Sequence, residues 1–442
     1  MDLISFGQRP DIFATNEIEI TPEFRRALDL LEYTKENIFI TGKAGTGKST
    51  LLKHFCGNTG KKIVVLAPTG VAALNVEGAT IHSFFQFHFG LLEGRNEEIK
   101  RLARKSEIFH NLDAVVIDEI SMVRADLMNA IDLSLRKNVG CDRPFGGKQL
   151  IVCGDLYQLP PVVASDEEKN YLFDRYGGIY YFCAPVFREI DLKKIVLNKI
   201  FRQTEDDYRN ILEKIRENSL SPADLERLNS RCGIVQPSEP IVTLATTNAI
   251  VERINTGKLN ELNGREMVYD ALISGDFGAG DYPADKTLRL KKGAQIMMVK
   301  NDSGGERRWA NGSLGVVKNF GADYVEVDIN GASYVVLSAE WQVFDYTYDR
   351  QREKIEKRTR GVFRQFPLKL AWAVTIHKSQ GKTFDRVIVD FGRGAFAHGQ
   401  AYVALSRAKT FDGLYLKTPV QYKDIILDED IKTFHGDKTE VF

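Results

Sequence analysis

Short apolar runs alternate with amphipathic stretches along the first half of the chain. Runs rich in Ile, Val and Leu, which are typical of strands, occupy residues 38–41, 62–67, 114–118 and 149–153. Amphipathic patterns that predict helices occupy residues 22–33 and 122–137. Continuously apolar strands separated by helices suit a sheet that is covered on both faces. This half of the chain therefore predicts an α/β domain with a parallel sheet.

A second pattern of the same kind begins near Ile241. It predicts a helix at 248–263 and further strands at 386–390 and 413–416. Residues 285–346 differ, because short alternating strands there are joined by Gly and Asn turns, among them Asn311-Gly312 and Asn330-Gly331. We therefore expect a small β-barrel inserted in a second α/β domain.

The length of 442 residues suits about three domains of ~150 residues each. We expect the first α/β domain at 1–190, with a small insertion around 70–110. The second is expected at 191–265 and 347–442, and the barrel at 266–346.

Charge and cysteine content narrow the class of protein only a little. The chain has 60 Lys+Arg and 60 Asp+Glu, but residues 350–369 carry eight basic residues against two acidic ones. That basic run could line an entrance for nucleic acid, or it could be a solvated helix face. No apolar run is long enough for a membrane span, no secretory signal is evident, and the five cysteines form no CxxC pair. We expect an intracellular protein, cytoplasmic or associated with the nucleoid if bacterial.

Residues 42–49, GKAGTGKS, fit the phosphate-binding pattern GxxxxGK[ST] between an expected strand and an expected helix. Glycines let backbone amides wrap a triphosphate, and a helix N-terminus adds partial positive charge. Lys48 is the candidate for the β/γ-phosphates and Ser49 for Mg²⁺. A Gly-rich turn that matches by chance is the alternative. The candidate nucleotide-binding residues are Gly42, Ala44, Gly45, Thr46, Gly47, Lys48, Ser49 and Thr50.

A second candidate for phosphate chemistry is the acidic pair Asp118-Glu119, which ends an apolar strand. Asp118 would hold Mg²⁺, and Glu119 would orient and polarise the attacking water. Alone, such a pair could simply close a strand. Together with the phosphate loop it predicts hydrolysis of ATP or GTP. Mg²⁺ is the only metal we expect, because no cluster at zinc spacing occurs.

Three further residues could reach the γ-phosphate. Gln158 lies in a Pro-stiffened loop after a third strand, and it could equally be part of a rigid turn. Arg202 and Arg407 lie far downstream and could act as arginine fingers if the two α/β domains face each other. Taken alone, either arginine fits a surface ion-pair residue better than a finger.

Seven segments occur in the order of superfamily 1 helicase motifs. They are GKAGTGKST, APTGVAALNVEGATIHSFF, VVIDEISMV, GDLYQLPPV, LNKIFRQ, AVTIHKSQGKTFDRVIVD and AYVALSRAK. The set resembles the petite integration frequency (Pif-type) DNA helicases, relatives of RecD, from about residue 20 to 416. The stretch 126–149, with RPFGG at 143–147, is similar to that family's signature segment.

The resemblance implies a monomer with two RecA-like P-loop domains, ATP in the cleft between them and a Src-homology-like barrel on the second. It also implies 5′ to 3′ translocation on single-stranded DNA and unwinding of duplex or forked DNA. G-quadruplex DNA and roles in DNA repair, recombination and telomere maintenance are further expectations. By position, Gln158, Arg202 and Arg407 would read the γ-phosphate. Gly381 and Lys382 would join the nucleotide side of the cleft.

Two segments offer the hydroxyls and backbone amides with which a motor grips a strand. The resemblance places strand contacts in both, and the candidates are Pro68, Thr69, Gly70, Ala72, His82, Thr375, His377, Lys378 and Ser379. For His82 and His377, a buried core histidine is the alternative. The aromatic cluster 84–89 could stack on bases, although core packing accounts for at least half of it.

The region upstream of the phosphate loop departs from the family pattern. Related helicases often have a Gln there that reads adenine, whereas residues 21–26, TPEFRR, contain none. Phe24 or Arg25 could stack on a base instead.

Two other functions stay open: an RNA-directed superfamily 1 motor, and a nucleotide-gated clamp that binds single strands without unwinding.

Overall fold

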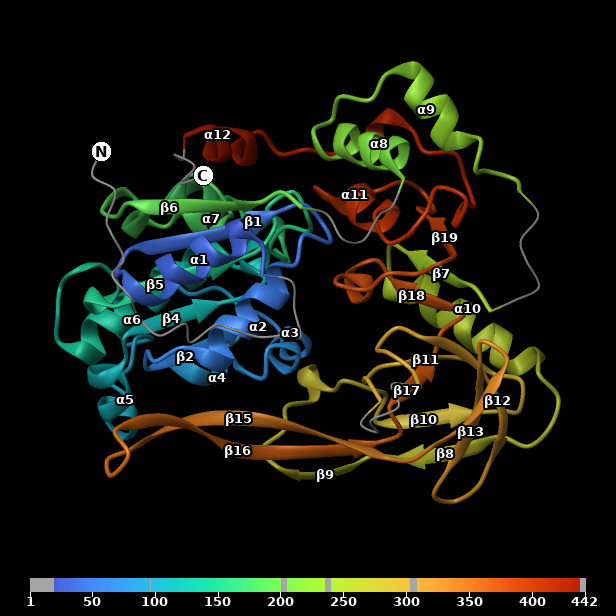
Figure 1. Ribbon diagram of the computed structural model, residues 1–442, viewed down its shortest axis with the longest axis horizontal. Coiled ribbons are helices and arrows are strands. Elements are labelled where there is room, and N and C mark those ends of the chain that lie inside the picture. The colour runs from blue at the N-terminus through green and yellow to red at the C-terminus, as the bar shows by residue number, and fades with distance from the viewer. Residues whose placement is uncertain (1–19, 96, 200–204, 235–239, 303–307, 438–442) are drawn as a thin grey trace.

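The computed structural model describes residues 20–95, 97–199, 205–234, 240–302 and 308–437. Two α/β units lie beside each other, and a group of antiparallel sheets adjoins the second unit (Figure 1). A long β hairpin extends from that group along the first unit. The α/β class and the parallel sheets predicted from the sequence are confirmed.

The first unit is built on a parallel sheet with the strand order β3-β2-β4-β5-β1-β6. Its strands are β1 (Asn37–Gly42), β2 (Ile63–Ala67), β3 (Ala79–Thr80), β4 (Ala114–Ile117), β5 (Gln149–Cys153) and β6 (Leu192–Leu197). Its helices are α1 (Pro22–Tyr33), α2 (Lys48–Asn58), α3 (Gly70–Asn75), α4 (Ile81–Phe85), α5 (Ser106–Asn111), α6 (Ala125–Val139) and α7 (Asp166–Tyr176).

Both faces of this sheet are buried, as the continuous apolar strands require. Alternate side chains of β1 point to opposite faces: Ile38 and Ile40 pack with α1 and α2, whereas Phe39 packs in the cluster that contains α6. Thr21 caps α1 by accepting a hydrogen bond from the Phe24 backbone amide at 3.2 Å. The carboxyl ends of β1, β4 and β5 therefore lie at one edge of a rigid sheet.

The second unit has a four-stranded parallel sheet of order β18-β7-β19-β20. Its strands are β7 (Val242–Ala245), β18 (Ala373–Thr375), β19 (Val387–Asp390) and β20 (Leu414–Leu416). Its helices are α8 (Asp206–Arg216), α9 (Pro222–Asn229), α10 (Asn248–Glu261) and α11 (Gln400–Leu405).

The insert between α10 and β18 contains three antiparallel sheets, ordered β14-β13-β12-β11-β17, β10-β8 and β15-β16-β9. Its strands are β8 (Met267–Asp270), β9 (Leu272–Gly275), β10 (Thr287–Leu290), β11 (Gln295–Met298), β12 (Leu314–Phe320), β13 (Val325–Ile329), β14 (Ala332–Val336), β15 (Ala339–Asp349), β16 (Lys354–Gln365) and β17 (Leu368–Leu370).

Three segments belong to a different unit of the structure from the one that the predicted domain boundaries gave them. Strand β6 completes the first sheet by pairing with β1, although residues from 191 onward were expected in the second domain. The expected boundary at 346 falls within β15, and the insert continues to β17. Helix α12 (Glu429–Asp437) returns to the first unit, where the Phe434 and Phe182 ring centroids lie 4.1 Å apart. Apolar packing with partners distant in sequence decides these placements.

The basic run 350–369 is mainly strand β16, so the helix-face alternative is wrong. Among the helices of the described residues, none combines the length and apolarity that crossing a membrane requires.

Candidate active site in the cleft between the α/β units

The phosphate loop joins the end of β1 to the first turn of α2. Gly45 and Gly47 have φ values of 83° and 86°, a left-handed conformation that glycine adopts without steric cost. The Lys48 Nζ donates hydrogen bonds to the carbonyl oxygens of Gly42 at 2.7 Å and Lys43 at 2.9 Å. Burial lowers the pKa of Lys48, and the Asp155 carboxylate opposes that shift. The loop therefore holds an ammonium group where a triphosphate would meet backbone amides.

The acidic pair follows β4 at the same edge of the sheet. Glu119 has a φ of 50°, which is rare for a residue with a Cβ and directs its carboxylate away from the strand. Burial raises the pKa of Asp118. Burial, with the nearby Asp118 carboxylate, raises the pKa of Glu119 to about 7. A carboxylate with that pKa suits a general base near neutral pH.

Ser49 and Asp118 both line the cleft, and together they present hydroxyl and carboxylate oxygens. Mg²⁺ prefers oxygen ligands and usually completes its shell with waters and substrate phosphates. These two residues therefore fit a magnesium ion held mainly by the nucleotide. Across the described residues, no group of three or more His, Cys, Asp or Glu side chains forms a separate metal site.

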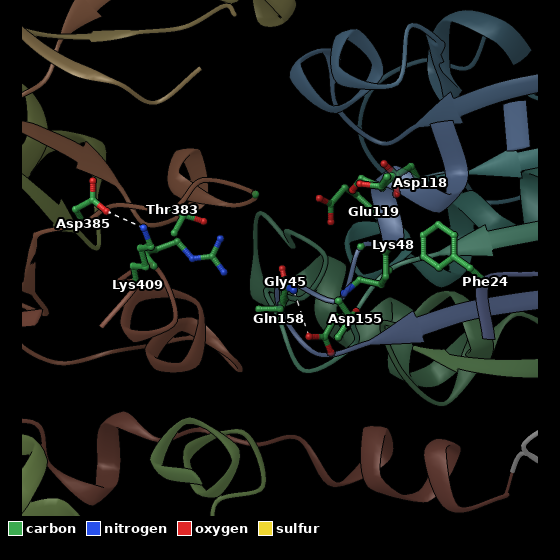
Figure 2. Close-up of a pocket in the computed structure, with 18 residues that line it drawn as sticks. Phe24, Gly45, Lys48, Asp118, Glu119, Asp155, Gln158, Thr383, Asp385 and Lys409 are labelled. Atoms are coloured by element: carbon green, nitrogen blue, oxygen red, sulfur yellow. Dashed lines mark hydrogen bonds and ion pairs between the residues drawn. The ribbon is translucent and has the colours of Figure 1, made fainter. Parts of the chain in front are cut away.

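The cleft has a volume of about 870 Å³ and is walled by both α/β units. Figure 2 shows Lys48, Asp118 and Glu119 on the wall that the first unit supplies. Thr383, Asp385 and Lys409 lie on the facing wall, where Lys409 Nζ forms an ion pair with Asp385 at 3.5 Å (Figure 2). The wall formed by the first unit also includes Phe24, Ala44, Gly45, Thr46, Gly47, Ser49, Thr50, Gly154, Asp155 and Gln158.

Two of the predicted γ-phosphate residues lie on the cleft, from opposite units. Gln158 is buried, and its Nε2 donates to an Asp155 carboxylate oxygen at 3.2 Å (Figure 2). Arg407 is 1% exposed, and its guanidinium donates to the carbonyl oxygens of Val403 at 2.8 Å and Lys382 at 3.1 Å. These bonds fix the guanidinium in place, so little side-chain entropy remains to be lost when it meets an anion. Arg202 lies outside the described residues.

The remaining predicted nucleotide residues divide between the cleft and its surroundings. Gly381 lines the cleft, but the Lys382 Nζ donates to Asn311 Oδ1 of the insert at 2.7 Å. Burial lowers the pKa of Lys382 to about 8. On the base side, Phe24 lines the cleft while Arg25 is not among its lining residues.

The predicted strand contacts lie outside the cleft, on both units. Thr69 caps α3, with its Oγ1 accepting from the Ala72 amide at 3.3 Å, and Gly70 lies so close to the Asp281 carboxylate that a Cβ there would collide with it. Pro68 precedes this cap, partly buried. His82 stacks on Phe89 with ring centroids 5.0 Å apart.

On the second unit, Thr375 ends β18, and its Oγ1 accepts from the Lys378 amide at 3.2 Å. His377, Lys378 and Ser379 form a 3₁₀ turn directly after it. Burial lowers the pKa of His377, as it does for His82, so both imidazoles are neutral near pH 7. The aromatic cluster behaves as expected, since Phe84, Phe85 and Phe87 are buried whereas Phe89 is 86% exposed.

Three residues that the sequence did not single out as site residues also join the two walls. Arg216 forms an ion pair with Asp155 at 3.5 Å and stacks on Tyr157. Burial would raise the pKa of Asp155, but Arg216 and Lys48 hold it below its ordinary value. The Tyr402 hydroxyl accepts from the Ala44 amide at 3.1 Å. Gln380 Nε2 donates to Glu119 Oε2 and to Gln158 Oε1, each at 3.1 Å. No local pattern marks these contacts, because each joins segments from different units.

Two family models match the chain: PIF1-like helicase over residues 23–219, and UvrD-like helicase C-terminal domain over residues 370–411. The chain is 36% identical over 395 residues to the ATP-dependent DNA helicase PIF1 of Homo sapiens, an alignment that covers 86% of this chain but 58% of that relative. The match to the ATP-dependent DNA helicase Pif1 of Bdellovibrio bacteriovorus is 32% identical over 448 residues and covers 97% of this chain and 94% of the relative.

A solved structure gives the same result for the fold. The crystal structure of Bacteroides sp Pif1 in complex with ADP-AlF4 aligns with a TM-score of 0.88 at 35% identity, over 95% of this chain and 97% of that one. Sequence similarity thus runs through nearly the whole length of a relative and is matched by the fold. The chain belongs to the PIF1-like helicase family.

Proposed function

We propose that the chain is an ATP-dependent DNA helicase that hydrolyses ATP in the cleft and moves along single-stranded DNA. One observation carries the proposal: Lys48, Asp118 and Glu119 from one unit and Arg407 from the other line the same cleft. A triphosphate bound there contacts both units, so its hydrolysis changes how they associate. The two relatives, each an ATP-dependent DNA helicase by name, support the choice of ATP and DNA.

In this mechanism, the amides of the phosphate loop and the Lys48 ammonium hold the β- and γ-phosphates. Glu119 accepts a proton from the water that attacks the γ-phosphorus, and Gln158 positions that water. Arg407 stabilises the charge that develops on the transferred phosphoryl group. Ser49 and Asp118 would hold a Mg²⁺ ion, which would supply positive charge to offset that of the phosphates. Phe24 supports the base by stacking, and Arg202 is proposed as a second finger.

Movement along DNA needs two grips that change their separation. We assign one to Pro68, Thr69, Gly70, Ala72 and His82 on the first unit. The other is the turn that contains Thr375, His377 and Lys378 on the second unit, braced by the buried Ser379. Closure of the cleft on ATP would bring the grips together, and opening after hydrolysis would advance one of them. The family resemblance supports 5′ to 3′ movement, monomeric action, and forked and G-quadruplex DNA as substrates in genome maintenance. An intracellular site of action fits these substrates.

Unwinding of duplexes that carry a 5′ or a 3′ single-stranded tail tests this function and its direction together. We expect ATP-dependent strand release from the 5′-tailed duplex and little from the 3′-tailed one. Lys48→Ala should abolish release while single-strand affinity stays within about twofold, because the lysine contacts phosphate of the nucleotide and not of the DNA. Release from the 3′-tailed duplex alone would reverse the direction. Hydrolysis without release would favour the clamp, and equal stimulation by RNA would favour the RNA-directed motor.

A further inference from the structure

The amide of Gln380 joins the second unit to two cleft residues of the first. Its Nε2 lies 3.1 Å from Glu119 Oε2 and 3.1 Å from Gln158 Oε1. Gln158 in turn donates to Asp155 Oδ2 at 3.2 Å. A chain of hydrogen bonds therefore runs from Asp155 through both glutamines to the proposed general base.

The direction of each bond in this chain is determined by its two ends. An ionised carboxylate only accepts hydrogen bonds, so Asp155, whose pKa is lowered, must face an N–H, and so must Glu119 in the ionised form that acts as the base. Gln158 therefore turns its amide nitrogen to Asp155, which leaves its oxygen for Gln380. Gln380 must then direct both of its N–H groups across the cleft, one to Gln158 and one to Glu119. A glutamine is the uncharged side chain that supplies two donors from one planar group at this reach.

The backbone of Gln380 is tied to the proposed grip on the second unit. The Gln380 backbone N–H donates to the His377 carbonyl oxygen at 3.2 Å, and Gln380 directly follows the 3₁₀ turn His377–Ser379. Within this turn, the Ser379 hydroxyl donates to the Ile376 carbonyl oxygen at 2.7 Å, and Ser379 is fully buried. A turn braced in this way moves as one piece, so a strand held at 375–379 also determines where the Gln380 amide lies.

We propose that Gln380 is a positioning residue that couples the grip at 375–379 to Glu119, and so transmits the presence of a DNA strand to ATP hydrolysis. This inference rests on the proposed helicase function. Gln380 is not among the residues that line the cleft, and it acts by holding the Glu119 carboxylate. A misplacement of a catalytic group by ~1 Å can lower the rate about 10²-fold. Removing the Gln380 side-chain amide should therefore lower kcat strongly and change the affinities for ATP and DNA little.

The test compares the wild-type chain with the variants Gln380→Ala and Gln380→Glu, by steady-state ATP hydrolysis with and without saturating oligothymidine. For Gln380→Ala we expect the ratio of DNA-stimulated to basal kcat to fall about tenfold or more. KM for MgATP and Kd for labelled oligothymidine, measured by anisotropy, should stay within about threefold. Gln380→Glu preserves the size of the side chain but places a carboxylate against Glu119, so its ratio should fall at least as far.

Gln342→Ala is the matched control, because Gln342 is exposed on β15 and bonds only the Thr359 hydroxyl, at 3.0 Å. Its ratio should equal that of the wild type. The double variant Gln158→Ala/Gln380→Ala should lower the stimulation ratio by less than the product of the fold-changes in the two single variants. The reason is that both side chains act through one chain of hydrogen bonds.

An unchanged ratio in both Gln380 variants would overturn the inference, as would a loss that follows Kd or KM in parallel. A wild-type chain without any stimulation by DNA would instead overturn the proposed function.

Discussion

Glu119 is held by its own backbone and by three neighbouring groups. Its backbone has a positive φ and its carboxylate lines the cleft, where burial and then Asp118 raise its pKa and the Lys48 charge lowers it. Gln380 donates to one of its oxygens. A carboxylate restrained in this way has little freedom to lose when it orients a water, as expected for a preorganised base.

Glu119→Gln should bind MgATP with unchanged affinity and lose about 10²–10⁴-fold in turnover, since the amide cannot accept the proton. Nucleotide affinity by fluorescence titration and single-turnover hydrolysis separate the two effects. Turnover within threefold of the wild type would remove Glu119 from the role of base.

Arg407→Ala should slow hydrolysis by about 10³-fold or more, because no other described guanidinium lines this cleft. Arg407→Lys is the control, since it keeps the charge without the planar fork and should recover only part of the rate. Hydrolysis rates at saturating MgATP give both values. Full activity in Arg407→Ala would show that the developing charge is stabilised from elsewhere.

At the scale of elements, the hairpin β15–β16 binds the insert to the first unit. The Tyr346 hydroxyl accepts from the Val65 amide at 2.9 Å and donates to the Val65 carbonyl oxygen at 3.0 Å. β2 pairs with β3 only at Leu66 and Ala67, and Val65 lies just before them. The Tyr346 side chain therefore bonds the backbone groups of Val65 in β2. Lys105 adds an ion pair with Asp345 at 2.6 Å. The hairpin thus lies against the first unit near the β3 edge of its sheet (Figure 1).

Tyr346→Phe should weaken docking of the hairpin by about 1–3 kcal/mol, because it leaves the N–H and C=O of Val65 buried without partners. Hydrogen exchange at the amides of β2 and β15 would report the change as faster exchange. Tyr348→Phe is the control, since that hydroxyl meets only Lys62 Nζ at 3.5 Å and should cost within about 0.5 kcal/mol. Equal exchange in both variants would contradict this account of the docking.

At the scale of the whole molecule, polar contacts hold the two walls of the cleft in register. They include the pairs Arg216–Asp155, Tyr402–Ala44, Gln380–Glu119 and Lys43–Glu213, beside a small apolar contact of Ala44 and Leu159 with the core of the second unit. Polar contacts of this kind can exchange partners as the units move, which a continuous apolar core cannot do without exposing its surface. An interface of this composition suits a cleft that opens and closes.

Arg216→Ala should destabilise the molecule by about 3–5 kcal/mol, because it removes the cation that pairs with the buried Asp155 carboxylate and leaves only the Lys48 charge nearby. Arg227→Ala is the control on the neighbouring helix, since its pair with Asp207 is 50% and 71% exposed and should contribute at most about 1 kcal/mol. Thermal unfolding by circular dichroism compares the two variants. A smaller loss of thermal stability in Arg216→Ala than in Arg227→Ala would show that the buried Arg216–Asp155 pair does not stabilise the closed cleft.

The sequence by itself determined the elements and the chemistry of the first wall. Apolar periodicity identified the strands and helices, and the spacing of Gly45, Gly47 and Lys48 identified a phosphate loop, because these signals are local and each depends on one segment. The tertiary structure alone decided that β6 joins the first sheet, that most of residues 350–369 form strand β16 paired with β15, and that Arg216 and Gln380 contact cleft residues of the first unit. Those features depend on which apolar faces and buried polar groups meet in the folded chain. A contact between two distant segments produces no periodic pattern in the sequence of either segment.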